Sequence, residues 1–402
     1  MTSARTALWI GTYPAAGTGT PAGLGEGIWR VDLDVASGGW GVAELVAVTP
    51  APSFVAVHPS GGVLYAVGEL TQGTVTAFAV PDQPAHAPLA VLDAVGSGGS
   101  DPCHLLLAPD ARTLFVANYS SGTLGVLPLD AGGRFTAEVR AAGGPVQVLG
   151  HAGSGPDASR QEGPHAHFVA IAPGGRFVIV VDLGTDELRR YAWDPATGLV
   201  SAAGIAAALP SGTGPRHLVF APDGRTVYVV GELDMSVRVL AWDPVSASGT
   251  LVQSLPAGPA GTRTAPRPLP SHVELDGDRL LVAVRTADVL VAYAVAADGS
   301  LTLDGVRRLS GAWPRHFAVV AGTVVVAAQV GDVLVALRPA DGAGPGTVAS
   351  TLALPAPACV VATGPCGVSR RDRTLRSRRS GRGVTMARGH FPASPQPPQE
   401  SP

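Results

Sequence analysis

Histidine and arginine recur along the chain at the start of short apolar segments. Acidic, amide and further basic residues recur where the following apolar segment ends. Guanidinium groups that converge on one place can bind a phosphate or carboxylate, and a histidine or carboxylate beside them can activate water. This combination predicts an acid–base site that binds an anion. The first set is His104, His165, His167, Arg216, His217, His272, Arg315 and His316, and the second is Glu69, Asn118, Asp182, Glu232, Arg285 and Gln329.

Three of the arginines, Arg216, Arg285 and Arg315, are difficult to explain as structural residues, because converging guanidinium groups repel one another. Glu232 can balance one of them, and a substrate phosphate or carboxylate could balance the others by bidentate pairing. Glu232 lies sixteen residues after Arg216, a separation of one strand, one turn and most of a second strand. Antiparallel strands joined in this way return to the same end. We therefore expect Arg216 and Glu232 to be in contact, with His167 and Arg285 contributed by neighbouring units.

The histidines also have a structural interpretation. A single histidine at a strand start is more often a hydrogen-bonding structural residue than a catalyst, and we assign that role to His104 and His272. His165 and His167 are two residues apart, a spacing that puts both side chains on one face of a strand and could suggest a metal. No third ligand, such as a cysteine or a matched aspartate pair, accompanies them, so we expect neither a metal nor another cofactor.

A repeated unit must position these residues. Each copy has an apolar strand, a Pro-x-Gly type turn, a second apolar strand, a polar break and a third strand. The turn centres recur about every 45 to 65 residues, a period typical of β-propeller blades. No segment has a sustained helical period. The clear copies are 52–80, 102–130, 164–194 and 215–243, and the weaker ones are 271–295 and 314–339.

The repeat predicts an all-β fold, a seven-bladed β-propeller of four-stranded antiparallel blades around a channel. Six copies are visible, and residues 8–38 supply the seventh. Closed propellers usually share one blade between the two ends of the chain, so we expect residues 5–13 to pair near 348–362. Equivalent positions in such a fold face one axis, so the two sets of polar residues should form rings around one mouth of the channel.

Composition separates the chain into two parts. Residues 1–363 carry the repeat and form the predicted propeller. Residues 364–402 are rich in Arg, Ser and Pro and almost without apolar residues, so they cannot offset their ordering entropy by burial, and we expect a disordered tail. The formal net charge is −3, but residues 367–402 contribute about +6 of it and the remainder about −9. An acidic body argues against a nucleic-acid partner.

The N-terminal residues have no apolar run long enough for a signal peptide, and no segment approaches the roughly 20 apolar residues of a membrane span. We therefore expect a soluble cytoplasmic protein without a membrane partner, as a monomer or weak oligomer. The three cysteines, Cys103, Cys359 and Cys366, are too few and too scattered for a disulfide framework or a metal knuckle.

Several of these motifs resemble the lactonase family of propellers, which includes cofactor-free 6-phosphogluconolactonases and fungal carboxy-cis,cis-muconate cyclases. The resemblance covers residues 7–362 and is most specific at IGTYP (10–14), 163–186, 214–233 and WPRHF (313–317). It implies that His167 and Glu232 are acid/base residues and that Arg216 and Arg285 bind an anion. The sequence departs from the family at Gly231 and Val284, where the family usually has Asn, and at Ala328 in a usual Asn-Gln pair.

The function predicted from this resemblance is hydrolysis of a small anionic sugar lactone, with 6-phosphogluconolactone as the expected substrate. A δ-lactone is an activated ester, so it needs only a base for water and charge stabilisation for the oxyanion. A lactonising isomerase that acts on a muconate, and an inactive propeller that serves as a binding module, are the alternatives. The predicted catalytic residues are His167 and Glu232, and the predicted substrate-binding residues are Arg216, Arg285, His165, His217, Arg315 and His316.

Overall fold

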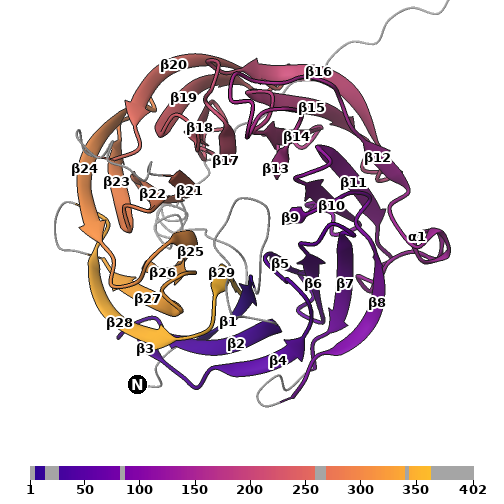
Figure 1. Cartoon of the computed structure of the whole chain (residues 1–402), viewed down its shortest axis with the longest axis horizontal. Helices are drawn as coiled ribbons and strands as arrows, with labels where there is room; N and C mark the ends of the chain where they lie inside the picture. The colour runs from indigo at the N-terminus through magenta and orange to yellow at the C-terminus, as the bar shows by residue number, and fades with distance from the viewer. Residues whose placement is uncertain (1–4, 14–26, 82–86, 259–268, 340–343, 364–402) are drawn as a thin grey trace, which may run out of the picture. The chain divides into compact units, whose positions relative to one another are not determined.

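The computed structural model describes residues 5–13, 27–81, 87–258, 269–339 and 344–363. These residues form seven antiparallel sheets arranged as blades around a central axis (Figure 1), with one short helix, α1 (Ala137–Ala142). The predicted all-β propeller of seven blades is confirmed. In six blades the chain runs from the innermost strand outward, and neighbouring strands in the sequence are neighbours in the sheet.

The bounds of these six blades follow in chain order. The first two blades are β5 (Val55–Val57), β6 (Val63–Gly68), β7 (Thr74–Ala79) and β8 (Ala90–Gly96), then β9 (Pro102–Leu107), β10 (Thr113–Asn118), β11 (Thr123–Pro128) and β12 (Gln147–Leu149). The next two are β13 (Ala166–Ile171), β14 (Phe177–Asp182), β15 (Glu187–Trp193) and β16 (Val200–Ala208), then β17 (Pro215–Phe220), β18 (Thr226–Gly231), β19 (Ser236–Asp243) and β20 (Ser248–Pro256). The last two are β21 (Leu269–Asp276), β22 (Arg279–Arg285), β23 (Val289–Val295) and β24 (Leu301–Arg308), then β25 (Pro314–Val320), β26 (Thr323–Ala328), β27 (Val333–Arg338) and β28 (Thr347–Ala353).

The seventh blade joins the two ends of the described chain. Its strands are β1 (Arg5–Thr12), β2 (Gly27–Asp34), β3 (Gly39–Trp40), β4 (Glu44–Val48) and β29 (Pro357–Ala362). Strand β29 is innermost and pairs antiparallel with β1, for example Ile10 with Val360. The expected pairing of residues 5–13 is therefore confirmed at 357–362, whereas 347–353 is the outer strand of the preceding blade. This closure joins the two ends of the described chain in one sheet, and the edges that remain are the short outer strands of the blades.

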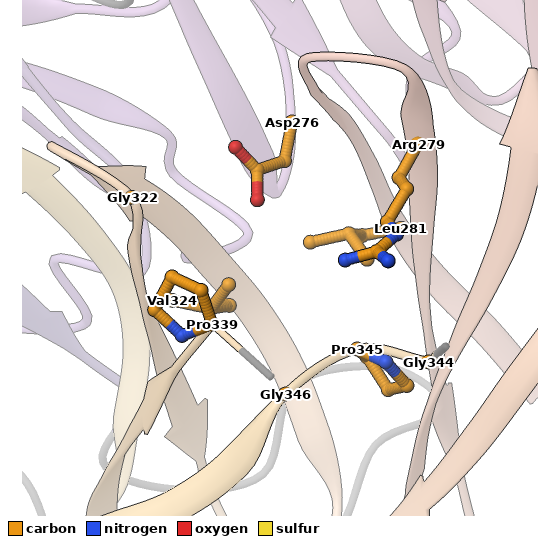
Figure 2. Close-up of a pocket in the computed structure, with 9 residues that line it drawn as sticks. All are labelled: Asp276, Arg279, Leu281, Gly322, Val324, Pro339, Gly344, Pro345 and Gly346. Atoms are coloured by element: carbon orange, nitrogen blue, oxygen red, sulfur yellow. The ribbon is translucent and has the colours of Figure 1, made fainter. Parts of the chain in front are cut away.

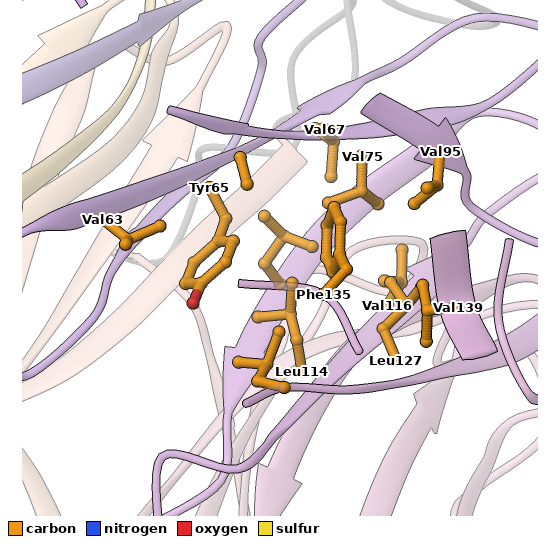
Figure 3. Close-up of a cluster of buried hydrophobic side chains, with 13 residues drawn as sticks. Val63, Tyr65, Val67, Val75, Val95, Leu114, Val116, Leu127, Phe135 and Val139 are labelled. Atoms are coloured by element: carbon orange, nitrogen blue, oxygen red, sulfur yellow. The ribbon is translucent and has the colours of Figure 1, made fainter. Parts of the chain in front are cut away.

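The core lies between adjacent blades. Each blade buries both faces of its second strand against its neighbours, which explains why β6, β10, β18 and β26 are continuous apolar runs and do not alternate. Figure 3 shows the contact between the blades of β6 and β10, which α1 completes through Val139 below its N-cap Thr136. The side chains labelled there are Val63, Tyr65, Val67, Val75, Val95, Leu114, Val116, Leu127, Phe135 and Val139.

One expectation concerns a part of the chain outside the described residues, and another concerns membrane spans. Residues 364–402, the predicted tail, lie outside the described residues. The division at 363 therefore stays a prediction. Within the described residues, no helix is long and apolar enough to cross a bilayer.

Candidate functional site

Each innermost strand begins and each second strand ends at the same end of the propeller axis, here named the mouth of the channel, as the pairing of Pro215 with Gly231 shows. At this mouth the innermost strands carry a β-bulge. The register slips between Pro215 and His217, so Arg216 is an extra residue without a partner on β18. Successive side chains of a regular strand point to opposite faces, and a bulge re-aims one of them. Arg216 and His217 therefore both contact the next blade, Arg216 at the backbone oxygen of Ser271 and His217 at the ring of His272.

The bulges divide the first set of predicted residues into two levels, whereas the sequence suggested one row. Register shifts at the same place in six innermost strands put one residue of each at the mouth and the next residue one level deeper. The mouth level holds Cys103, His167, Arg216, Ser271, Arg315 and Ala358. The deeper level holds six aromatic rings, here named the histidine collar: Phe54, His104, Phe168, His217, His272 and His316.

The histidine collar is a closed ring. Going around it, neighbouring ring centroids are 4.0 to 5.5 Å apart. Nδ1 of His217 and Nδ1 of His272 are 2.8 Å apart, so one donates and the other accepts. Backbone N–H groups of the next blade donate to His104 (from Val169, 3.2 Å) and to His316 (from Val360, 3.3 Å). These bonds link adjacent blades, which agrees with the structural role expected of His104 and His272.

Burial keeps the collar histidines uncharged. It lowers the pKa of His104, His217 and His272 well below the usual histidine value, and it lowers the pKa of His316 to about 3, in each case with help from Arg216. His217 and His316, predicted to bind substrate, thus lie one level below the mouth as neutral rings.

At the mouth, Glu232 is the centre of a cluster of three arginines. Arg285 donates to its Oε2, the Nε of Arg216 is 3.0 Å from the same oxygen, and the Nη2 of Arg160 donates to Oε1 at 2.8 Å. The expected contact between Arg216 and Glu232 is therefore present, and Arg285 reaches the same carboxylate from the following blade. Arg216 also donates to the backbone oxygen of Ser271.

The charges in this cluster do not cancel. Burial alone would raise the pKa of Glu232, but Arg285, Arg160 and Arg216 together hold it well below its usual range, so the group is a carboxylate. Burial and the charge of Arg285 lower the pKa of Arg216 to about 9, which still leaves it protonated at neutral pH. One carboxylate therefore faces three guanidinium groups, an arrangement that favours a further anion.

Arg315 extends the positive charge of the mouth and has its own carboxylate. Its Nη2 lies 3.4 Å from Oε2 of Glu69, and its guanidinium lies over the ring of Tyr13, 4.7 Å from the centroid. Burial raises the pKa of Glu69, and Arg315 opposes that rise. Four arginines therefore share two glutamates at the mouth.

His167 lies beside this cluster and contacts two residues of the preceding blade, Cys103 and Tyr119. Its Nδ1 is 3.8 Å from Sγ of Cys103, and its ring lies 5.5 Å from that of Tyr119. Burial and the charge of Arg216 lower the pKa of His167 well below the usual value, so it is neutral. His165 stacks on Tyr119 at 4.5 Å and pairs with the exposed carboxylate of Glu162. The structure thus brings His167, Arg216, Glu232 and Arg285 to one mouth.

Asn118 and Asp182 do not belong to this ring, contrary to the sequence-based expectation. They end their strands one residue before the position that corresponds to Glu232. Asn118 donates to the backbone oxygen of Ser97, and Asp182 accepts from the N–H groups of His165 and Thr185. Both residues therefore stabilise turns.

Sequence reasoning missed two residues of the site, Tyr119 and Arg160. Tyr119 follows Asn118 at the true equivalent of Glu232. Arg160 comes from the connection between β12 and β13, outside the repeat. No repeat position in the sequence marks Arg160; in the structure the neighbouring Gln161 is fully buried and fixes this connection to Leu183 and Asp186.

Gln329 follows Ala328, which pairs with Pro314 at the mouth. Its side chain is fully buried, yet neither amide atom hydrogen bonds to the protein within the described residues. Gln329→Met should therefore raise the free energy of unfolding by about 1 kcal/mol, measured by denaturant titration. If the amide binds substrate, KM rises in the same variant. A loss of stability on this substitution would contradict the interpretation.

A small pocket elsewhere in the ring is too small for a sugar (Figure 2). It lies at the opposite end of the blades, near the turn that joins Asp276 to Arg279, and its volume is about 10 Å³, close to that of one water molecule. Among the described residues, no group of three or more His, Cys, Asp or Glu is placed to hold a metal ion.

Comparison with known proteins identifies the family. A family model described as "Lactonase, 7-bladed beta-propeller" matches residues 7–362. A 6-phosphogluconolactonase of Bacillus subtilis (strain 168) is 29% identical over 359 residues, which cover 88% of this chain and 97% of that protein. A 6-phosphogluconolactonase of Pectobacterium atrosepticum is 30% identical over 279 residues, 69% of this chain and 76% of that protein.

A solved structure of a gluconolactonase has a similar sequence and a similar fold. The Pseudomonas aeruginosa periplasmic gluconolactonase is 28% identical, covers 90% of this chain and 99% of its own, and superposes with a TM-score of 0.79. The fold and the matches together define a seven-bladed propeller enzyme that acts on lactones. The chain belongs to the lactonase family.

Proposed function

We propose that this enzyme hydrolyses a small anionic sugar lactone, with 6-phosphogluconolactone as substrate and 6-phosphogluconate as product. The observation that carries the proposal is the excess of positive charge at the mouth, where four arginines, Arg160, Arg216, Arg285 and Arg315, pair with two carboxylates of the described residues, Glu232 and Glu69. A phosphate or carboxylate would complete this arrangement. The names of the two curated relatives support the same substrate.

In the proposed mechanism, Glu232 or His167 takes a proton from water, and the water oxygen bonds to the lactone carbonyl carbon. Arg216 and Arg285 stabilise the oxyanion that forms. The bond to the ring oxygen then breaks, that oxygen takes the proton back from the base to become a hydroxyl, and the carboxylic acid that forms loses its proton to solvent, leaving a carboxylate product. An anion bound beside Arg216 would offset one of the charges that lower the pKa of His167, and so make His167 a better base.

The direct test is a coupled assay in which 6-phosphogluconolactone is generated immediately before use and the appearance of 6-phosphogluconate is followed with a dehydrogenase. We expect hydrolysis well above the spontaneous rate, with or without EDTA, because the proposed groups are side chains of the protein. A rate equal to the spontaneous one would contradict the proposal. Loss of the rate in EDTA would contradict the proposed mechanism.

A further inference from the structure

Arg160 differs from the other arginines at Glu232 in its access to solvent. Its side chain is 28% exposed, whereas those of Arg216 and Arg285 are 4% and 2% exposed. Arg216 and Arg285 are held by β17 and β22, but Arg160 belongs to the connection between β12 and β13. A ligand that enters the mouth can therefore reach Arg160 without any change in the blades.

Arg160 also occupies the oxygen of Glu232 that the other two leave open. Arg216 and Arg285 approach Oε2, and Arg160 donates to Oε1 at 2.8 Å. A carboxylate that is to accept a proton from water needs a free lone pair directed at that water. In the structure, the contact of Arg160 competes with water for Oε1.

The guanidinium of Arg160 has N–H groups that can donate further hydrogen bonds. Its Nη2 makes both of its side-chain hydrogen bonds, to Glu232 and, at 3.1 Å, to the hydroxyl of Tyr119. Among the described residues, its Nε and Nη1 have no hydrogen-bond partner. The guanidinium plane presents paired donors that match two oxygens of a phosphate or carboxylate. Arg160 can thus take an anionic ligand by a small rotation of its side chain.

The backbone that carries Arg160 is fixed. Its N–H donates to the backbone oxygen of Asp157 at 3.0 Å, and Gln161 donates to Leu183 and Asp186 at 2.8 Å each. The side chain can therefore change partner while its Cα stays in place.

We propose that Arg160 selects lactones that carry an anionic group: it turns toward that group when the substrate binds, and it thereby releases Oε1 of Glu232 to accept a proton from water. This inference rests on the proposed lactone hydrolysis and adds to it the choice between charged and neutral substrates. A neutral lactone has no anionic group to which Arg160 can bind, so Arg160 keeps its hydrogen bond to Oε1 of Glu232 and water cannot donate to that oxygen.

The test compares two lactones that differ only in a phosphate, 6-phosphoglucono-δ-lactone and glucono-δ-lactone, on the full-length enzyme and on Arg160→Met. We expect the ratio of kcat/KM for the phosphorylated lactone to that for the neutral one to fall by about 10- to 100-fold in the variant. The acid limb of kcat/KM should also move to higher pH, because Arg160 is one of the charges that lower the pKa of Glu232. Arg189→Met is the matched control, since Arg189 pairs with Glu187 at 2.8 Å on an outer strand and is 20% exposed.

Equal loss of activity toward both lactones in Arg160→Met would overturn the inference while leaving lactone hydrolysis intact. A wild-type enzyme that hydrolyses neither lactone would instead overturn the proposed function. Calorimetric titration with 6-phosphogluconate and with gluconate separates the two cases. We expect the wild type to bind 6-phosphogluconate more tightly than Arg160→Met does. If the two proteins bind 6-phosphogluconate with equal affinity, the role of Arg160 is again excluded.

Discussion

Glu232→Gln is expected to lower kcat for the lactone by about 100- to 10 000-fold, because the variant keeps the shape of the side chain and loses the proposed base. His167→Ala should also lower mainly kcat. Arg216→Ala should raise KM and lower kcat together, because it removes a group that holds both the bound anion and the oxyanion. Steady-state kinetics with freshly generated lactone give both constants. Wild-type rates in all three variants would show that these residues do not form the site.

Stability must be measured beside activity, because Glu232→Gln leaves Arg160, Arg216 and Arg285 without their shared carboxylate. Buried charges that lose their partner destabilise a protein by about 3–5 kcal/mol. The double variant Glu232→Gln/Arg216→Met removes one of the unpaired charges. It should recover part of the free energy of unfolding that the single variant loses and none of the activity. Recovery of both would mean that Glu232 acts only through stability.

A control with the same chemical change separates the site from the rest of the fold. Glu187→Gln breaks an ion pair with Arg189 on β15, away from the channel, and partly exposed pairs contribute little to stability. We expect its kcat and melting temperature to match those of the wild type.

The strands, the blade repeat and the closure by the two ends of the chain could all be predicted from the sequence. Each depends on a pattern that strand geometry imposes directly, namely apolar runs, turns and a fixed period. The contact between Arg216 and Glu232 was predictable for the same reason, since two strands joined by a turn fix which ends meet.

The two levels of side chains around the axis could not be predicted, because no residue type in the sequence marks the position at which a bulge adds one residue. Arg216 and His217 are adjacent in the sequence, and only the slip against β18 turns both toward the channel. The assignment of Asn118 has another cause: counted along β10 and β18, Asn118 corresponds to Gly231 and Tyr119 to Glu232, and choosing the polar residue at the strand end missed this offset of one residue. Arg160 was missed for a different reason. It lies outside the repeat, so no equivalent position in another blade indicated where its side chain would lie.

The histidine collar predicts that the fold loses stability when the pH falls below about 6.5. Burial lowers the pKa of His104, His217, His272 and His316 in the folded state, whereas in the unfolded chain they titrate near 6.5. Below that pH the unfolded chain binds protons that the folded chain does not, so protonation favours unfolding. Each histidine costs on the order of 1 kcal/mol between pH 6.5 and 5.5, or about 4 kcal/mol for four, a large part of an ordinary stability.

Several buried carboxylates also affect this test, because the pKa of Glu232 is lowered whereas burial raises the pKa of Glu69, Asp276 and Glu274. Glu232, with its lowered pKa, contributes stability that is lost only as the pH falls below about 4.5. Glu274 acts in the opposite direction, because burial raises its pKa to about 8 and the folded state then gains protons below that pH. About a third of the Glu274 side chain is exposed, so its effect should be smaller than that of the four histidines together. Between pH 7.5 and 5.5 the loss of stability should therefore be clear.

Urea denaturation at pH 7.5, 6.5 and 5.5 measures this effect, and His104→Phe tests its origin. Phe54 and Phe168 flank His104 in the histidine collar, so a phenyl ring fits this level. The variant loses the acceptor for the N–H of Val169 and should be about 1–3 kcal/mol less stable at pH 7.5. Its loss between pH 6.5 and 5.5 should nevertheless be smaller than that of the wild type by about 1 kcal/mol. Phe168→Leu, which removes no titrating group, should lower stability equally at every pH. A wild-type stability that stays constant down to pH 5.5 would show that the collar does not exclude protons.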